Sequence, residues 1–150
     1  MEEVFARLKA RMLEGMVFHD EMARYYDFLN MCEFRDEHRK HYAEETEGYQ
    51  KLCDYYMHHF NKLLPNLPMS RPEVIPDSWR MYTRQDVDEG TRTNAKRDGI
   101  RKWIEWETET KDLYEDMCGE LLNNGEIAAA IFVGKFVKDV DCELAEATSL

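Results

Sequence analysis

Two glutamates, Glu45 and Glu107, occupy helical positions whose neighbours one and two turns away are mostly apolar or aromatic. A side chain with such neighbours faces the core of a helical protein. A carboxylate in a core is strongly destabilising unless it is protonated, paired with a positive charge or bound to a metal ion. The pattern therefore predicts either a metal site or a buried polar network at these two residues.

Histidines at helical spacing could supply nitrogen ligands beside these carboxylates. His19 falls on an apolar stripe, and His41 lies one turn before Glu45 on the same helix face as His38. A histidine and a glutamate four residues apart can share one cation. The alternative is structural, because His19 could be a hydrogen-bonded core histidine while His38 and His41 reach water near the start of their helix.

The C-terminal helical stretch offers one further acid on a plausible face, Asp139, which could share a cation with Glu143 four residues later. The candidate metal ligands are therefore Glu45, Glu107, His19, His41 and Asp139.

Apolar stripes define the first two helices. One stripe predicts a helix over 2–29, and a second stripe with a different phase predicts a helix over 33–63. The phase changes near Asn30, a residue type that can adopt the left-handed conformation at a helix end. We expect a corner there, with one bent helix as the alternative.

All four prolines lie in one short stretch, which predicts a long crossover over 64–83. Two more helices are expected over 84–122 and 126–147. The first of these two helices begins either at a capping-box pattern, Thr83–Asp86, or later, near Thr93. With no strand-like alternation, the chain is predicted to be one all-α domain over 1–150, a four-helix bundle of two helical hairpins.

The stretches His41–Glu45 with Gln50–Leu52, and Trp106–Glu107 followed by Tyr114, resemble the second and third helices of the ferritin-like superfamily. This resemblance implies a ferritin-like four-helix bundle. In the family, glutamates from helices one and three join a Glu-x-x-His pair from helices two and four to hold two iron or manganese ions. Here Gly48 stands three residues after Glu45, and Cys142 three residues after Asp139, so both family histidines are missing.

The composition and charge of the chain indicate which kinds of partner and cellular location to expect. The 150 residues include 31 acidic and 20 basic side chains, giving a formal net charge of -11 that disfavours nucleic acids and anionic membranes. No apolar run is long enough for a signal peptide or a membrane span, so a cytoplasmic protein is expected. Four scattered cysteines without a Cys-x-x-Cys pair are interpreted as reduced, structural core thiols.

Two functions are compatible with these patterns. The missing histidines favour a ferritin-like bundle without an intact di-metal centre, acting as a structural or protein-interaction module that self-associates or binds a protein partner. The inward glutamates favour a divergent ferritin-like metalloprotein that binds iron or manganese, with Fe(II) or peroxide oxidation, or ion storage, implied by the resemblance. The first of these is the preferred hypothesis, without catalytic residues or a firmly assigned cofactor.

Overall fold

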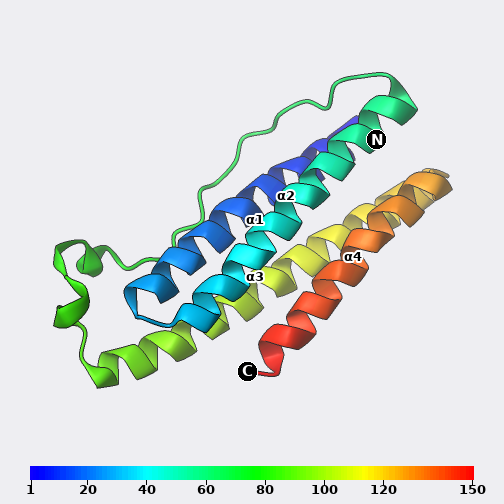
Figure 1. Cartoon of the computed structure of the whole chain (residues 1–150). Helices are drawn as coiled ribbons and strands as arrows, with labels where there is room; N and C mark the ends of the chain where they lie inside the picture. Colours follow the sequence, from blue (N-terminus) through cyan, green and yellow to red (C-terminus); the bar gives the residue numbers. More distant parts are fainter.

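A computed structural model describes residues 1–150 and contains four long helices and no strand: α1 (Glu2–Phe28), α2 (Cys32–Phe60), α3 (Glu89–Asn123) and α4 (Ile127–Thr148). Helices α1 and α2 form one antiparallel hairpin and α3 and α4 another, with α2 and α3 pointing the same way (Figure 1). None of the helices combines the length and the apolar character needed to cross a bilayer. The prediction of an all-α chain with four helices is confirmed.

A tight corner separates α1 from α2. Asn30 adopts a left-handed conformation with φ of 58°, and the Met31 N–H donates to the Tyr26 carbonyl at 2.9 Å. This hydrogen bond closes the end of α1 in the manner of a helix C-cap, and α2 begins directly afterwards at Cys32. The chain therefore turns a corner at the phase change, and the alternative of one bent helix is wrong.

Helix α3 begins between the two starts that the sequence left open. The Thr83 N–H donates to Asp86 Oδ2 at 2.7 Å, but this contact closes only a short 3-10 turn, η2 (Arg84–Asp86). The start of α3 is instead capped by Asp88, whose Oδ1 accepts from the Thr91 N–H at 2.7 Å. An acceptor side chain at this position satisfies an N–H group that has no partner within the helix.

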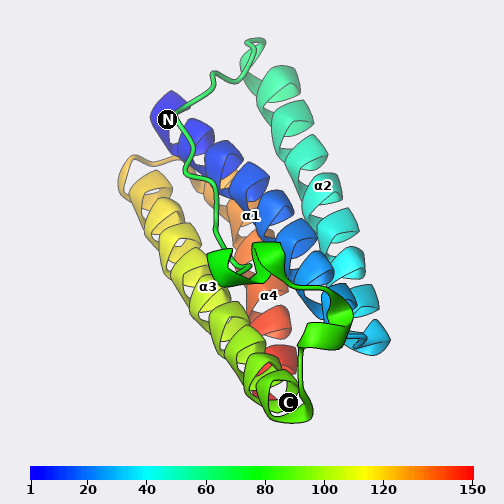
Figure 2. The same ribbon diagram turned by 90° about the vertical axis from the view of Figure 1, so that its left-hand side faces the viewer.

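The segment between α2 and α3 returns along the face formed by α1 and α3 (Figures 1 and 2), and it includes a second 3-10 turn, η1 (Asp77–Met81). Lysine side chains hold it there: Lys9 Nζ donates to the Leu64 carbonyl at 3.1 Å, and Lys102 Nζ donates to the Val74 carbonyl at 2.9 Å. Trp79 stacks on Tyr25 of α1 with ring centroids 5.0 Å apart. These contacts hold the return segment against the helices along its length.

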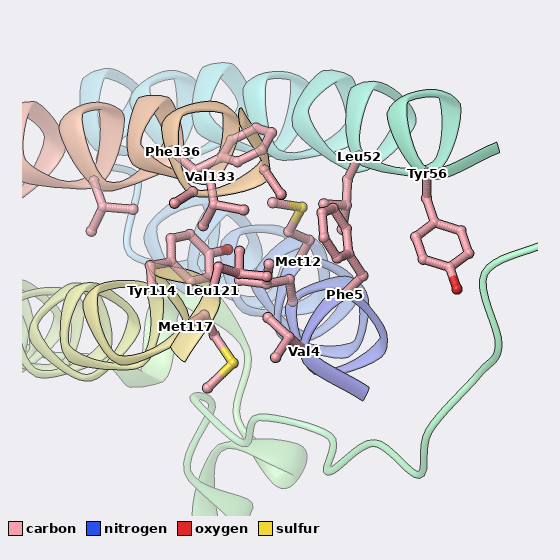
Figure 3. Close-up of a cluster of buried hydrophobic side chains, with 14 residues drawn as sticks. Val4, Phe5, Met12, Leu52, Tyr56, Tyr114, Met117, Leu121, Val133 and Phe136 are labelled. Atoms are coloured by element: carbon pink, nitrogen blue, oxygen red, sulfur yellow. The ribbon is translucent and has the colours of Figure 1, made fainter. Parts of the chain in front are cut away.

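The core consists of two apolar clusters at different levels along the helices. The first gathers near the start of α1 and the end of α3 and includes Phe5, Met12, Leu52 and Leu121 (Figure 3). The second is richer in aromatic side chains and includes Tyr26 and Trp103. The candidate residues Glu45 and Glu107 belong to neither cluster.

Helices α1 and α3 approach each other closely at Gly99. A methyl group added there would clash with the Tyr26 hydroxyl oxygen, which itself donates to the Lys96 carbonyl at 3.1 Å. Packing is most extensive within each hairpin, and the two hairpins meet mainly through α1 and α3. Helices α2 and α4, in contrast, border an open cleft of about 810 Å³.

The cysteines are placed differently from the expectation. All four thiols are free; Cys32 and Cys142 are exposed, and Cys53 and Cys118 are half-buried. The prediction of core thiols is therefore wrong, because the inward positions beside them are filled by larger side chains such as Leu52.

Candidate metal centre

Each of the four helices contributes one ionisable side chain to a single cluster in the middle of the bundle. His19 comes from α1, Glu45 from α2, Glu107 from α3 and Glu143 from α4, and one nitrogen or oxygen of each lies within 4.8 Å of those of the other three. Carboxylate oxygens and an imidazole nitrogen are ligands that iron, manganese and zinc ions accept. The helices thus bring together a potential set of four metal ligands.

His19 lies between two carboxylates. Its Nε2 atom is 3.3 Å from Glu107 Oε1 and 3.1 Å from Glu143 Oε1. Nevertheless, His19 Nε2 and both carboxylate oxygens of Glu107 are buried and form no hydrogen bond of acceptable geometry. Buried polar atoms without partners are rare in folded proteins and cost free energy. The atoms approach one another closely without aligning as hydrogen-bonded pairs, which is the arrangement expected around a shared cation.

The two sides of the cluster differ in their access to water. His19 and Glu107 are fully buried, whereas Glu45 and Glu143 line the cleft between α2 and α4. The Glu143 side chain is 11% exposed. An ion or a small molecule can therefore reach the cluster only from the side of Glu45 and Glu143, where the cleft opens to solvent.

Gly15 makes room for the Glu45 carboxylate. A methyl group added at Gly15 would lie 3.1 Å from Glu45 Cδ and 3.2 and 3.3 Å from its two oxygens, closer than most side-chain contacts. Gly15 lies one helical turn before His19 on α1. The absence of a side chain at this position allows the carboxylate of α2 to reach the level of the histidine.

Burial and mutual contact change the acidity of all four groups. Burial raises the pKa of Glu45 to about 8 and that of Glu107 to about 7. Burial alone would lower the pKa of His19, but the carboxylates of Glu107 and Glu143 raise it to about 10. For Glu143, burial raises the pKa, but the close contact with His19 and its positive charge outweigh burial and lower the pKa. Without a metal, a protonated His19 at neutral pH therefore compensates the neighbouring negative charge.

A second histidine fixes the orientation of the first. The Nδ1 atoms of His19 and His38 are 3.0 Å apart, and His38 is fully buried. Burial, together with the neighbouring His19 and His41, lowers the pKa of His38 to about 2, so its ring is neutral and can accept a hydrogen bond. When His19 Nδ1–H donates to His38, Nε2 of His19 faces the two carboxylates, as a metal-ligating histidine requires.

Glu143 receives further support from two rings. The Trp103 Nε1–H donates to Glu143 Oε1 at 3.3 Å, and His41 Nδ1 lies 3.3 Å from the same oxygen. His41 is buried, with 3% of its surface exposed. His41 thus contacts the cluster through Glu143 and does not reach water, contrary to the structural alternative for this residue. The buried His38 does not reach water either.

The structure brings His19, Glu45 and Glu107 together, and it places His41 next to this group. Asp139 is not part of the cluster, because its side chain is exposed along the α2–α4 cleft. Glu143, one turn further along α4, takes the position that was assigned to Asp139. The buried residues Val133, Phe136 and Val140 follow one another at intervals of three and four, and a further step of three would have identified Glu143.

Comparisons of this chain with protein-family models, with curated proteins and with solved structures find no match. The function must therefore be inferred from the geometry and chemistry of the site.

Proposed function

We propose that this protein binds a divalent transition-metal ion, of the iron or manganese class, through His19, Glu45, Glu107 and Glu143. The observation that carries the proposal is the convergence of four ligand atoms within 4.8 Å, combined with buried atoms of His19 and Glu107 that form no hydrogen bond. Three carboxylates and one imidazole supply mainly oxygen ligands, which suit Fe(II) and Mn(II). The three carboxylates also provide the negative charge that a divalent ion needs in a buried site.

The topology supports a ferritin-like bundle as the context of this centre. Two hairpins with parallel middle helices, joined by a long return segment, have the arrangement that the resemblance implies (Figure 1). Under this proposal, the ligand set is a variant of the family pattern, with His19 on the first helix and Glu143 followed by Glu146 on the fourth. Iron held in such a centre supplies oxidation chemistry with oxygen or peroxide, as the resemblance implies.

The chain's own residues have separate roles in this proposal. His38 orients the imidazole of His19, and Trp103 holds one oxygen of Glu143 by its N–H group. Gly15 leaves space for the Glu45 carboxylate. Deprotonation of Glu45 and His19 must accompany metal binding, so these two residues release protons towards the cleft when an ion enters.

A metal-free structural or interaction module is the second candidate, and one observation favours it. The pair of contacts from His19 to Glu107 and Glu143 compensates the buried charges without an ion. Exposed apolar side chains at the α3–α4 turn, including Ile127 and Ile131, would then provide a contact surface for a second protein chain.

The metal content of the untagged protein separates the two candidates. We would measure it by elemental analysis as purified, and again after anaerobic loading with Fe(II) or Mn(II) and desalting. The Glu107→Gln variant tests the site, and Glu109→Gln is the matched control because the Glu109 side chain is 72% exposed on the same helix. A metal content in Glu107→Gln that is lower than in the parent and the control by about one ion per chain supports the metal centre. Equal metal content in all three proteins, or none in the parent, rejects it.

A further inference from the structure

Three ionisable side chains outside the four-residue cluster form a second group between α2 and α4. Ligand atoms of Glu37, His41 and Glu146 lie within 4.8 Å of one another. His41 Nε2 is 3.2 Å from Glu37 Oε1 and 3.6 Å from Glu146 Oε2. Two carboxylates and one imidazole nitrogen thus meet at one point on the open side of the bundle.

The buried atoms of this group lack hydrogen-bond partners, just as those of the first cluster do. His41 is only 3% exposed, yet its Nε2 atom forms no hydrogen bond, and Glu37 Oε1 is likewise buried without one. A buried imidazole nitrogen normally has a partner. Here the nitrogen faces two acidic side chains from different helices, and no basic group lies between them.

Nearby basic side chains do not balance the negative charges of Glu37 and Glu146. The nearest basic side chain is Lys40, whose Nζ is 3.9 Å from Glu37 Oε1 and whose side chain is 61% exposed. Two facing carboxylates repel each other unless a proton or a cation lies between them. An exposed lysine at this distance provides weak compensation, since water screens its charge.

From this geometry we infer a second cation site, formed by Glu37, His41 and Glu146, that takes a first-row divalent ion such as Zn(II), Mn(II) or Fe(II). Three protein ligands leave coordination positions for water, because the Glu37 and Glu146 side chains are 32% and 41% exposed. The ion is therefore more exchangeable than one held by the buried cluster.

One imidazole connects the two sites. When His41 Nε2 binds the second ion, its Nδ1–H faces two carboxylate oxygens, Glu44 Oε2 at 3.1 Å and Glu143 Oε1 at 3.3 Å. The ions would then be linked through His41 and the neighbouring Glu143 carboxylate, with no ligand in common. This link rests on the proposed function, whereas the second site itself does not depend on it.

The test is the stoichiometry of Zn(II) binding, measured by equilibrium dialysis and elemental analysis. The double variant Glu37→Gln with Glu146→Gln removes both carboxylates of the second site. The control, Glu33→Gln with Glu47→Gln, removes the same charge from exposed positions of α2. Far-UV circular dichroism confirms that every variant is folded.

We expect about two ions per chain in the parent and the control, and about one ion in either the double variant or Glu107→Gln. If the proposed function fails but the second site is real, the parent binds about one ion, which is lost only in the double variant. The inference is overturned if the double variant binds as many ions as the control, or if the parent binds none.

Discussion

The apolar cluster near the start of α1 and the ionisable cluster in the middle of the bundle are built on the same four helices, but their burial has opposite consequences. In the first, side chains such as Leu52 and Leu121 are fully buried against other carbon atoms, and their burial stabilises the fold (Figure 3). In the second, Glu107 is equally buried but its oxygens lack hydrogen-bond partners. Burial there costs free energy that a bound ion would recover.

The largest effect is expected in the apolar cluster. Leu121→Ala should lower the free energy of unfolding by about 2–5 kcal/mol, because it leaves a cavity among packed side chains. Urea unfolding measures this change, and Leu122→Ala is the control because Leu122 is 55% exposed. Metal content at low temperature should be unchanged in both variants. A loss of metal in folded Leu121→Ala would show that the two clusters are not energetically separate.

For Glu107→Gln in the metal-free protein, we do not expect the free energy of unfolding to fall. Replacing the buried acid by its neutral isostere removes a desolvation cost, while His19 keeps the Glu143 carboxylate, 3.1 Å away, as its partner. The free energy of unfolding should therefore be unchanged or higher by about 1 kcal/mol, while stabilisation by added metal is reduced. Thermal unfolding with and without Mn(II) tests both parts. A marked loss of stability without metal would instead identify the His19–Glu107 contact as a stabilising ion pair.

Gly15→Ala should weaken metal binding by about tenfold, the lower end of what misplacing a metal ligand costs, with little change in stability. The added methyl group displaces the Glu45 carboxylate, which lies 3.1–3.3 Å from it, while alanine itself favours the helix by up to about 1 kcal/mol. Gly119→Ala is the matched control, since no atom lies within 4 Å of the added group. Titration with Mn(II) measures both affinities, and equal values would show that Glu45 is not a ligand.

The stability of the metal-free protein should also depend on pH. His19, Glu45 and Glu107 all have raised pKa values, so each binds its proton more tightly in the folded state than in the unfolded state. Their contributions to the free energy of unfolding are therefore lost as the pH rises from the unfolded to the folded pKa of each group. This range is 4.5 to about 8 for Glu45 and 4.5 to about 7 for Glu107. For His19 it is 6.5 to about 10. Glu143, with a lowered pKa, is ionised in both states above neutrality.

The thermal midpoint of the metal-free protein should therefore fall by roughly 5 °C between pH 6 and 9. The shift produced by added metal should grow over the same range, because the ion displaces protons from His19 and Glu45. Thermal scans in matched buffers measure both quantities, and Glu45→Gln should show a shallower decline. A midpoint independent of pH would contradict the buried, protonated network.

The sequence predicted the four helices because their apolar stripes are long and the prolines occur together. It also identified His19, Glu45 and Glu107, whose inward direction follows from helical phase. The phase was less informative on α4, where a step from Val140 to Leu144 is as regular as a step to Glu143. The start of α3 was ambiguous for another reason, because a capping-box pattern can also close a 3-10 turn, as it does at Thr83. Metal binding and the ferritin-like relationship remain predictions.

The division of the ligands between the two hairpins has a consequence for the chain as an assembly. The α1–α2 hairpin carries His19 and Glu45, and the α3–α4 hairpin carries Glu107 and Glu143, so neither hairpin alone has a complete set. The return segment is the covalent connection between them. If it were cut, the protein would become a heterodimer of two helical fragments, and the ion would act as an association cofactor whose concentration sets how much of the dimer forms.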